Sequence, residues 1–248
     1  MRAILTWHSL DRSGSPISVP PDEFRRQVEW LAASGVRAVT VGKLLELPDE
    51  ADAAALTFDD GFANFGKEAA PVLGEYGIPA TIFVVTGHVG RDNRWGGRDT
   101  PGIPSLPLLG WDALARLREV GMSLAAHTRS HPRLPALDPG KLESEISGAA
   151  QDMEQHLGTR PEGFAYPYGE LDPASARVVE RTYQWACTTE LRPLEEPAQR
   201  HQLPRLDAWY LRDPARRAGW GSRSFRTWLW CRRQGRRVRA AVRKQVNP

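Results

Sequence analysis

Short apolar runs alternate along the chain with longer segments in which apolar residues recur at helical spacing. The first run covers residues 2–8, and a helical pattern follows over residues 20–35 with Phe24 and Leu31 on the same face. A second apolar run, residues 36–40, comes directly after that segment. The pattern therefore predicts a strand, a helix and a second strand, the order that builds parallel sheets.

The same alternation continues as far as residue 206. Further strands are predicted over residues 53–58, 80–85, 122–127, 163–166, 185–188 and 202–206, and helices over residues 64–76 and 111–120 and around Leu142, Ile146, Met153 and Leu157. No Gly-rich dinucleotide turn follows the first strand, which favours a closed or nearly closed barrel over an open doubly wound sheet. The expected fold is α/β, a distorted (β/α) barrel of about seven units.

The composition is that of an ordinary globular protein. At 248 residues, with 41% hydrophobic and 25% charged residues, the chain can bury a core and is neither disordered nor fibrous. Cys187 and Cys231 are its two cysteines. Two cysteines exclude a disulfide framework and a cysteine-based zinc cluster, so any metal ion must be held by histidine and carboxylate.

The net charge of +3 conceals two oppositely charged parts. Residues 212–248 contain 12 Lys and Arg against one acid, Asp213, whereas residues 1–211 contain 21 Lys and Arg against 29 acids. Because the larger part is acidic, the basic pI does not indicate a nucleic-acid-binding protein. We expect a barrel domain over residues 1–211, which carries the chemistry, and a basic Trp/Arg-rich tail over residues 212–248.

Two interpretations of this tail are open. Trp220, Phe225, Trp228 and Trp230 are interleaved with arginines. Such a segment is either a solvated, disordered end or a peripheral contact with an anionic membrane, which attracts segments rich in Arg and Trp. The first apolar run is too short for a secretory signal and no later run has the length of a membrane-spanning helix, so we expect a cytoplasmic location.

Polar residues suited to catalysis follow three of the predicted strands. His8 ends the first strand, Asp59 and Asp60 follow the third, and His127 ends the fifth. In a barrel of parallel strands the chemistry gathers where the strands end, so these side chains are expected on one face. The Gly/Pro-rich segment over residues 91–107 is expected to form a long loop over that same face.

Two short motifs at these strand ends suggest a metal site. In TFDDG, Asp59 and Asp60 are adjacent and point differently, so one carboxylate can bind a metal ion while the other acts as a base; alone, the motif is an ordinary turn. In HTRSH, His127 and His131 are four residues apart and can converge on one ion, although such pairs are common without a metal. Two histidines and one aspartate form a three-ligand set that leaves a position for water.

Together, TFDDG and HTRSH resemble the polysaccharide deacetylase family, carbohydrate esterase family four, and the resemblance spans residues 1–207. It implies that Asp59 is the catalytic base. It also implies that Asp60, His127 and His131 are the metal ligands.

A third motif of the family is matched in part by FAYPYG over residues 164–169. The resemblance implies that the backbone N–H of Tyr168 donates to the oxyanion. The family's motif usually begins with an arginine that orients the base, and here that position is Ala165. Arg205, near the end of a late strand, is the candidate replacement, and a structural ion pair with Asp207 is the alternative for it.

The family's carboxyl-terminal motif, which supplies a general-acid histidine, is absent. The opening LTWHSL resembles exopolysaccharide-type members that take their acid from the first strand, so His8 is the expected general acid. The alternative is a buried histidine satisfied by a carbonyl. The competing histidines are less suited, because His88 lies in a loop predicted to lead away from the barrel, His156 lies in a helix and His201 precedes a strand.

The implied function is metal-dependent hydrolysis of the N-acetyl group of an amino sugar or polysaccharide, with release of acetate. Zn²⁺ is the expected ion, with Co²⁺ or Ni²⁺ as alternatives, and the expected partner is an N-acetylated saccharide rather than a nucleic acid. Two other functions stay open: a deformylase-type hydrolase on the same fold and a non-catalytic sugar-binding protein. Five aromatic residues are candidates for stacking on a sugar ring: Trp7, Trp95, Trp111, Tyr166 and Trp209.

Overall fold

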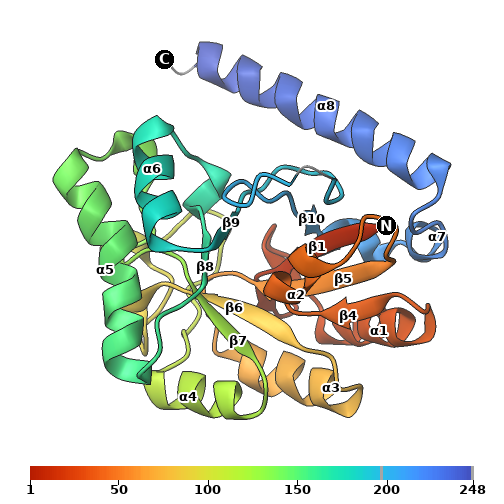
Figure 1. Ribbon diagram of the computed structural model, residues 1–248, viewed down its shortest axis with the longest axis horizontal. Helices are drawn as coiled ribbons and strands as arrows, with labels where there is room; N and C mark the ends of the chain where they lie inside the picture. Colours follow the sequence, from red (N-terminus) through yellow and green to blue (C-terminus); the bar gives the residue numbers. More distant parts are fainter. Residues whose placement is uncertain (196–197, 247–248) are drawn as a thin grey trace.

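The computed structural model describes residues 1–195 and 198–246, with the side chains of the last helix described up to Arg239. Its centre is a curled parallel sheet in the order β10-β1-β5-β6-β7-β8-β9, with β4 also paired to β5 (Figure 1). The strands are β1 (Arg2–Trp7), β4 (Arg37–Val39), β5 (Ala53–Phe58), β6 (Ala80–Val84), β7 (Ser123–Ala126), β8 (Gly163–Ala165), β9 (Trp185–Cys187) and β10 (Leu206–Asp207). A separate two-stranded ribbon pairs β2 (Ser9–Leu10) with β3 (Ser18–Val19).

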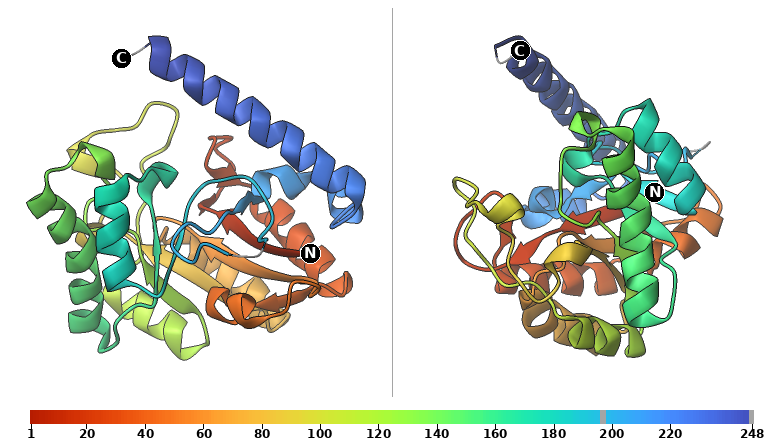
Figure 2. Two further views of the ribbon diagram at one scale, coloured as in Figure 1. Left: turned by 45° about the horizontal axis from the view of Figure 1, so that its top comes forward. Right: turned by 90° about the vertical axis from the view of Figure 1, so that its left-hand side faces the viewer.

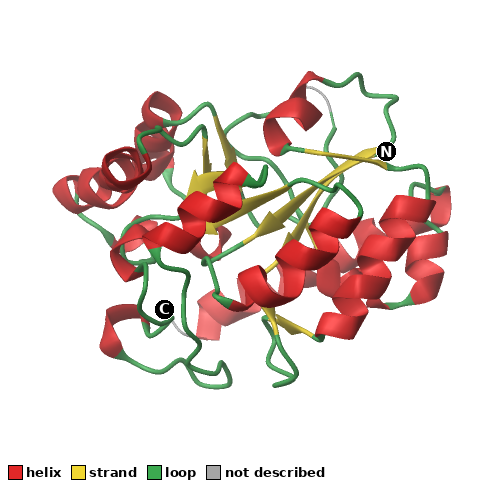
Figure 3. Cartoon of the chain, turned by 90° about the horizontal axis from the view of Figure 1, so that it is seen from below, coloured by secondary structure: helices red, strands yellow, loops and turns green. Residues whose placement is uncertain are grey.

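Helices cover the outside of the curled sheet, as Figure 3 shows. They are α1 (Pro21–Ala33), α2 (Val41–Glu46), α3 (Ala70–Glu75), α4 (Trp111–Glu119), α5 (Pro139–Leu157) and α6 (Pro173–Thr182). The segment predicted as one helix over residues 64–76 begins as a π-helical turn, Phe65–Ala69, and continues as α3.

The longest helix of the barrel, α5, has clear local signals at both ends. Asp138 caps its start by accepting a hydrogen bond from the backbone N–H of Lys141 at 3.0 Å. Gly158 ends it in the left-handed conformation, with φ of 69°. Between these signals Ile146 and Met153 are buried against the sheet, so the helical pattern of the sequence corresponds to an amphipathic helix.

The strands are buried on both faces, as expected for a parallel sheet covered by helices. In β5, Leu56 and Phe58 pack into the larger core between the sheet and the helices. Ala55, which precedes Leu56, belongs to the smaller core inside the curl, together with Ile4 and Phe83. The predicted barrel is therefore confirmed, and its strand ends project from a rigid, close-packed centre.

The seam between β9 and β1 is closed by residues 203–207. Leu203 donates to the carbonyl of Ala186 and accepts from the backbone N–H of Thr188, both at 2.8 Å. Three residues later, β10 pairs with β1 in register Leu5 to Leu206. The predicted strand over residues 202–206 is thus shorter and displaced, because Leu203 forms an isolated bridge and the ladder begins at Leu206.

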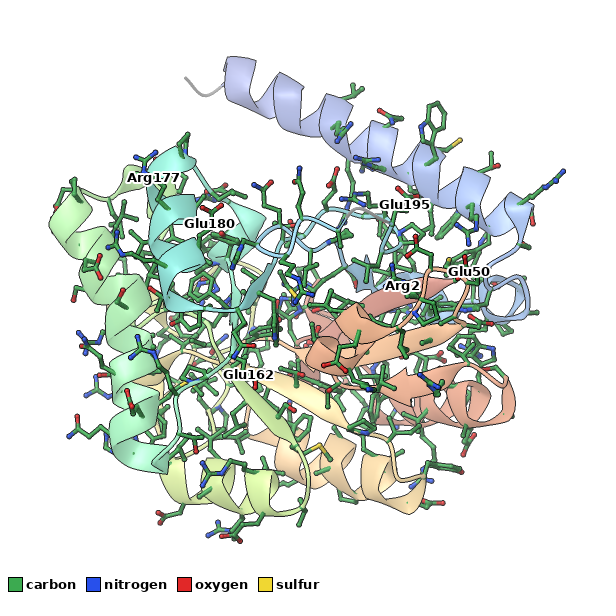
Figure 4. All side chains as sticks on the ribbon, in the orientation of Figure 1. Arg2, Glu50, Glu162, Arg177, Glu180 and Glu195 are labelled. Carbon is green, nitrogen blue, oxygen red and sulfur yellow. The ribbon has the colours of Figure 1, made fainter. Side chains whose placement is uncertain are left out.

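The two ends of the barrel differ in character. Arg2, labelled in Figure 4, is buried at the amino-terminal end of β1, where it donates to the carbonyl of Leu47 at 2.7 Å and pairs with Asp49. These contacts are structural. The polar residues that the sequence singles out lie at the opposite, carboxyl end of the strands.

The basic segment forms two helices, α7 (Pro214–Ala218) and α8 (Arg223–Val246). Helix α8 crosses one end of the barrel, and its carboxyl-terminal part extends beyond it (Figure 2). Phe225 and Leu229 are buried in the larger core and fix the start of α8 to the barrel. The domain division at residue 211 stays a prediction.

None of the described helices combines the length and the apolar composition needed to span a membrane.

Candidate metal centre and active site

The candidate site lies where three strands of the sheet end, two of them adjacent and the third separated from these by β6. His8 follows β1, Asp59 follows β5 and His127 follows β7. β1 and β5 are in register with Trp7 opposite Phe58, so His8 and Asp59 leave the sheet at the same level. The topology therefore brings together residues that are far apart in the sequence.

Asp60, His127 and His131 form a buried cluster, and their potential ligand atoms all lie within 4.8 Å of one another. Asp60 Oδ1 lies 3.6 Å from His127 Nε2 and 3.4 Å from His131 Nε2. Among the described groups of His, Cys, Asp and Glu, this set has the spacing to hold a metal ion. The structure thus gathers the three residues that the two motifs suggested.

The chemistry of the cluster fits a divalent cation. Asp60 Oδ1 is buried and has no hydrogen-bond donor among the described atoms. His127 Nδ1 donates to the Ala165 carbonyl at 2.7 Å, which leaves its Nε2 as a lone-pair donor. Burial raises the pKa of Asp60 and lowers the pKa of both histidines, so a cation between them would offset the cost of burying the carboxylate.

The backbone around this cluster is strained. The described non-glycine residues with positive φ are Asp60, Thr128, His131 and Tyr168, with φ between 59° and 69°. All four belong to the motifs at the strand ends. Left-handed backbone at non-glycine residues is costly and concentrates at functional sites, so the strain supports a functional assignment of this region.

The HTRSH loop is held by one face of α5. Glu145 accepts hydrogen bonds from the backbone N–H groups of Arg129 and Ser130 at 2.9 and 2.8 Å. Arg129 then forms a bidentate pair with Asp152, at 2.8 and 2.6 Å. A Cβ at Gly148 would lie 2.5 Å from the Arg129 guanidinium, so glycine is needed where Arg129 crosses α5.

Sequence reasoning missed these supporting residues. The spacing of Glu145, Gly148 and Asp152 places them on one helix face, and that spacing was the available signal. It gave no indication that this face meets the HTRSH loop rather than solvent.

Arg205 forms a bidentate ion pair with Asp59, at 2.5 Å between Nη1 and Oδ1 and 2.8 Å between Nη2 and Oδ2. Its Nε donates to the Thr188 carbonyl at 2.9 Å, and the guanidinium is buried. Burial alone would raise the pKa of Asp59, but the neighbouring positive groups, Arg205 foremost, together outweigh this and hold the pKa below its ordinary value. Asp207, the alternative partner, lies instead 3.8 Å from Arg236.

His8 faces the other side of Asp59, with 3.6 Å between its Nε2 and Asp59 Oδ2. One third of the His8 side chain is exposed, so it borders the site and reaches solvent. The alternative of a fully buried structural histidine does not describe this position.

Two aromatic rings surround His131. Trp95 stacks on it with 4.7 Å between ring centroids, and the Tyr168 ring meets it edge-on, also at 4.7 Å. The loop over residues 91–107, which carries Trp95, therefore lies over the site as predicted. The adjacent Gly169 has a φ of 70°, and a Cβ there would lie 2.1 Å from Thr189 Oγ1, which explains the glycine of the third motif.

The other candidate aromatic residues have different surroundings. Trp7 and Tyr166 are buried core residues, Trp111 stacks on His156 and Trp209 stacks under Arg212. Among the competing histidines, His88 contacts the Asp92 carbonyl and His201 contacts the Tyr183 carbonyl. The geometry thus places His8, and not these histidines, next to Asp59.

A family model described as polysaccharide deacetylase matches residues 47–184, which is more than half of the chain and includes both motifs. The chain belongs to the polysaccharide deacetylase family. The family match agrees with the resemblance carried by TFDDG and HTRSH.

Two relatives are similar over about three quarters of this chain. YxkH of Bacillus subtilis is 28% identical over 193 residues, which cover 75% of this chain and 64% of the relative. The poly-β-1,6-N-acetyl-D-glucosamine N-deacetylase of Staphylococcus epidermidis is 26% identical over 203 residues, covering 76% of this chain and 67% of the relative. The chain thus spans about two thirds of the length of these relatives.

Solved structures of other deacetylases share the fold. The deacetylase PplD of Streptococcus pyogenes, in complex with acetate, has a TM-score of 0.71 at 22% identity and covers 83% of this chain and 91% of its own. IcaB from Ammonifex degensii has a TM-score of 0.69 at 23% identity and covers 84% of this chain and 93% of its own. At these identities the likeness supports the deacetylase barrel as the fold.

Proposed function

We propose that this polysaccharide deacetylase family member hydrolyses the N-acetyl group of an amino sugar in a saccharide, releasing acetate and leaving a free amine. The observation that carries this proposal is the buried Asp60, His127 and His131 cluster beside a second carboxylate, Asp59, which is not part of the cluster. The Staphylococcus relative, named for deacetylation of poly-β-1,6-N-acetyl-D-glucosamine, supports an N-acetylated saccharide as the substrate class.

Asp60, His127 and His131 would hold the metal ion, for which Zn²⁺ is the proposed identity because of the histidine and carboxylate donor set. When bound, the ion supplies Lewis-acid activation of water and of the acetyl carbonyl. The geometry of the cluster supports this role for the three side chains.

The remaining steps use the chain's own residues. Asp59, oriented by its two hydrogen bonds from Arg205, accepts the proton of the attacking water. The backbone N–H of Tyr168 is the proposed donor to the oxyanion, which forms in a partly enclosed site between Trp95 and Tyr168. His8 donates a proton to the departing sugar nitrogen, because an amide anion is a poor leaving group.

The test is acetate release from N-acetylated oligosaccharides, measured with the purified protein before and after treatment with a chelator. We expect acetate release that chelation abolishes and added Zn²⁺ restores. A parallel assay for formate from N-formylated analogues distinguishes a deformylase. Binding of the oligosaccharides without release of either acid would support a non-catalytic sugar-binding protein and contradict the proposal.

A further inference from the structure

A large groove lies between helix α8 and the loops that follow β8 and β9. Its volume is about 1150 Å³, which is enough for several sugar units. One wall is formed by Gly169, Thr189 and Glu190 from the barrel, and the other by arginines of α8. The groove is separate from the metal cluster, whose residues do not line it.

The groove is strongly basic. The lining includes five arginines, Arg133, Arg233, Arg236, Arg237 and Arg239, against the two acids Glu170 and Glu190. Clustered guanidinium groups in a concave surface focus a positive potential and attract anions. Residues 1–211 are acidic overall, so this local excess of positive charge comes mainly from α8.

The two acids of the groove do not neutralise all five of its arginines. Glu170 pairs with Arg133. Glu190 is shared among three guanidinium groups: it accepts from Arg233, from Arg237 at 2.8 Å and from Arg192 at 3.1 Å. Arg236 lies 3.8 Å from Asp207, too far for a hydrogen bond. One carboxylate cannot accept from all the N–H donors of three guanidinium groups. Some of these donors are therefore left for an anionic oxygen of a ligand.

Arg239 lies further along the same helix. Its Nε donates to the Gly235 carbonyl within α8 at 3.3 Å, and its side chain lines the groove. Arg236 and Arg239 are therefore the arginines of α8 with the weakest carboxylate contacts among the described groove residues.

The groove leads towards the metal cluster. Arg133 lies over the Tyr168 ring, 4.7 Å from its centroid, and that ring contacts His131. Gly169, next to Tyr168, lines the groove itself. A saccharide whose acetyl group lies at the metal cluster would therefore extend past Tyr168 and along α8.

We propose that this groove binds phosphate groups of the substrate, so that the saccharide acted on is phosphorylated or diphosphate-linked. This inference rests on the proposed deacetylase function. Phosphate oxygens match the bidentate geometry of guanidinium groups. Three of the α8 arginines contact the barrel: Arg233 and Arg237 donate to Glu190, and Arg236 lies 5.6 Å from the Tyr210 ring. This orientation favours a ligand inside the groove over a flat membrane surface.

The test compares two substrates, chitotriose and chitotriose carrying a terminal 1-phosphate, with the metal-loaded protein. We expect kcat/KM to be higher for the phosphorylated substrate. The double variant Arg236→Gln/Arg239→Gln should lower the ratio of the two kcat/KM values about tenfold, because the charge-assisted hydrogen bonds lost from these two partly exposed side chains together weaken binding by about that factor. The preference should also weaken as salt concentration rises.

The matched control is Arg223→Gln/Arg226→Gln, which removes the same charge from exposed positions of α8 outside the groove. It should leave the ratio unchanged. Direct binding of the phosphorylated chitotriose to metal-free protein, measured by calorimetry, provides a readout that does not depend on turnover. The double variant should bind it about tenfold more weakly than the control.

Three results would overturn the inference or separate it from the proposed function. Equal kcat/KM values for both substrates, unchanged in the double variant, would overturn the phosphate assignment and leave the deacetylase proposal standing. Loss of sedimentation with phosphatidylglycerol vesicles in the double variant, without any preference for the soluble phosphate, would assign the groove to a membrane surface instead. Retained phosphate-dependent binding without acetate release from either substrate would support the groove and contradict the proposed deacetylase function.

Discussion

Arg205 and Asp59 are 146 residues apart in the sequence and form a buried bidentate ion pair inside the barrel. The seam residues 203–207 carry Arg205 to the end of β1, and β5 carries Asp59 to the same level. This contact is the one expected if Arg205 replaces the family's motif arginine, whose corresponding position here is Ala165.

Arg205→Gln should lower the free energy of unfolding by about 3–5 kcal/mol at pH 7, because it leaves the Asp59 carboxylate buried without its partner. Arg205 holds the folded-state pKa of Asp59 below its ordinary value of 3.8, so the pair stabilises the fold above that pH and less below it. The difference in free energy of unfolding between wild type and variant should therefore persist from pH 7 down to about pH 4 and narrow as pH falls further, where Asp59 of the unfolded chain becomes protonated. Urea unfolding of both proteins at several pH values measures this difference in the free energy of unfolding.

The control for this prediction is the double variant Arg205→Gln/Asp59→Asn, in which no unpaired charge remains. It should be more stable than Arg205→Gln alone, since neutral replacement of both partners costs much less than removal of one. A double variant that is less stable than the single variant would contradict the assigned pairing.

His131→Ala and Asp60→Ala should each lose bound metal, because each removes one of three ligands from the buried cluster. Elemental analysis after dialysis against Zn²⁺ measures the stoichiometry. Asp59→Asn is the matched control: it should keep the metal and lose activity by a factor of about 10² to 10⁴, as expected for a general base. A full equivalent of zinc in His131→Ala would show that the cluster is not the metal site.

His8→Ala should reduce activity steeply on an N-acetyl sugar and much less on an activated acetate ester, whose leaving group needs no proton. The reason is that His8 lies beside Asp59 and reaches solvent at the edge of the site. Steady-state kinetics on the two substrates separate the effects. His88→Ala, which alters a histidine bound to the Asp92 carbonyl, serves as the comparison and should affect both substrates alike. Equal loss on amide and ester in His8→Ala would indicate a collapsed pocket.

Glu145→Ala should weaken metal binding by a factor of about 10 to 100 although Glu145 is not a ligand, because it removes the acceptor that holds the HTRSH loop. Competition with a metal indicator measures the dissociation constant. Glu145→Gln, which keeps one acceptor oxygen, should show a smaller effect. Glu143→Ala, on an exposed part of α5 where Glu143 pairs with Arg181, should have none. An unchanged dissociation constant in Glu145→Ala would mean that the loop holds its shape without α5.

The sequence by itself determined the barrel and placed His8, Asp59 and His127 at the carboxyl ends of its strands. Alternation of apolar runs with helical patterns is a local property, and it located β1, β5, β6 and β7 within a residue or two. The carboxyl ends of parallel strands share one face, so the order of strands was enough to place His8, Asp59 and His127 together. TFDDG and HTRSH are local motifs as well, and they identified the cluster and the family before any contact was known.

Only the tertiary structure decided which distant groups meet. A strand pattern does not state which of two carboxylates an arginine will reach, and Arg205 pairs with Asp59 instead of its near neighbour Asp207 because the barrel closes at residues 203–207. The support of the HTRSH loop by Glu145, and the direction in which the α8 arginines point, likewise depend on how helices pack against the sheet. Such contacts arise from packing between elements, which the periodicity within one element does not encode.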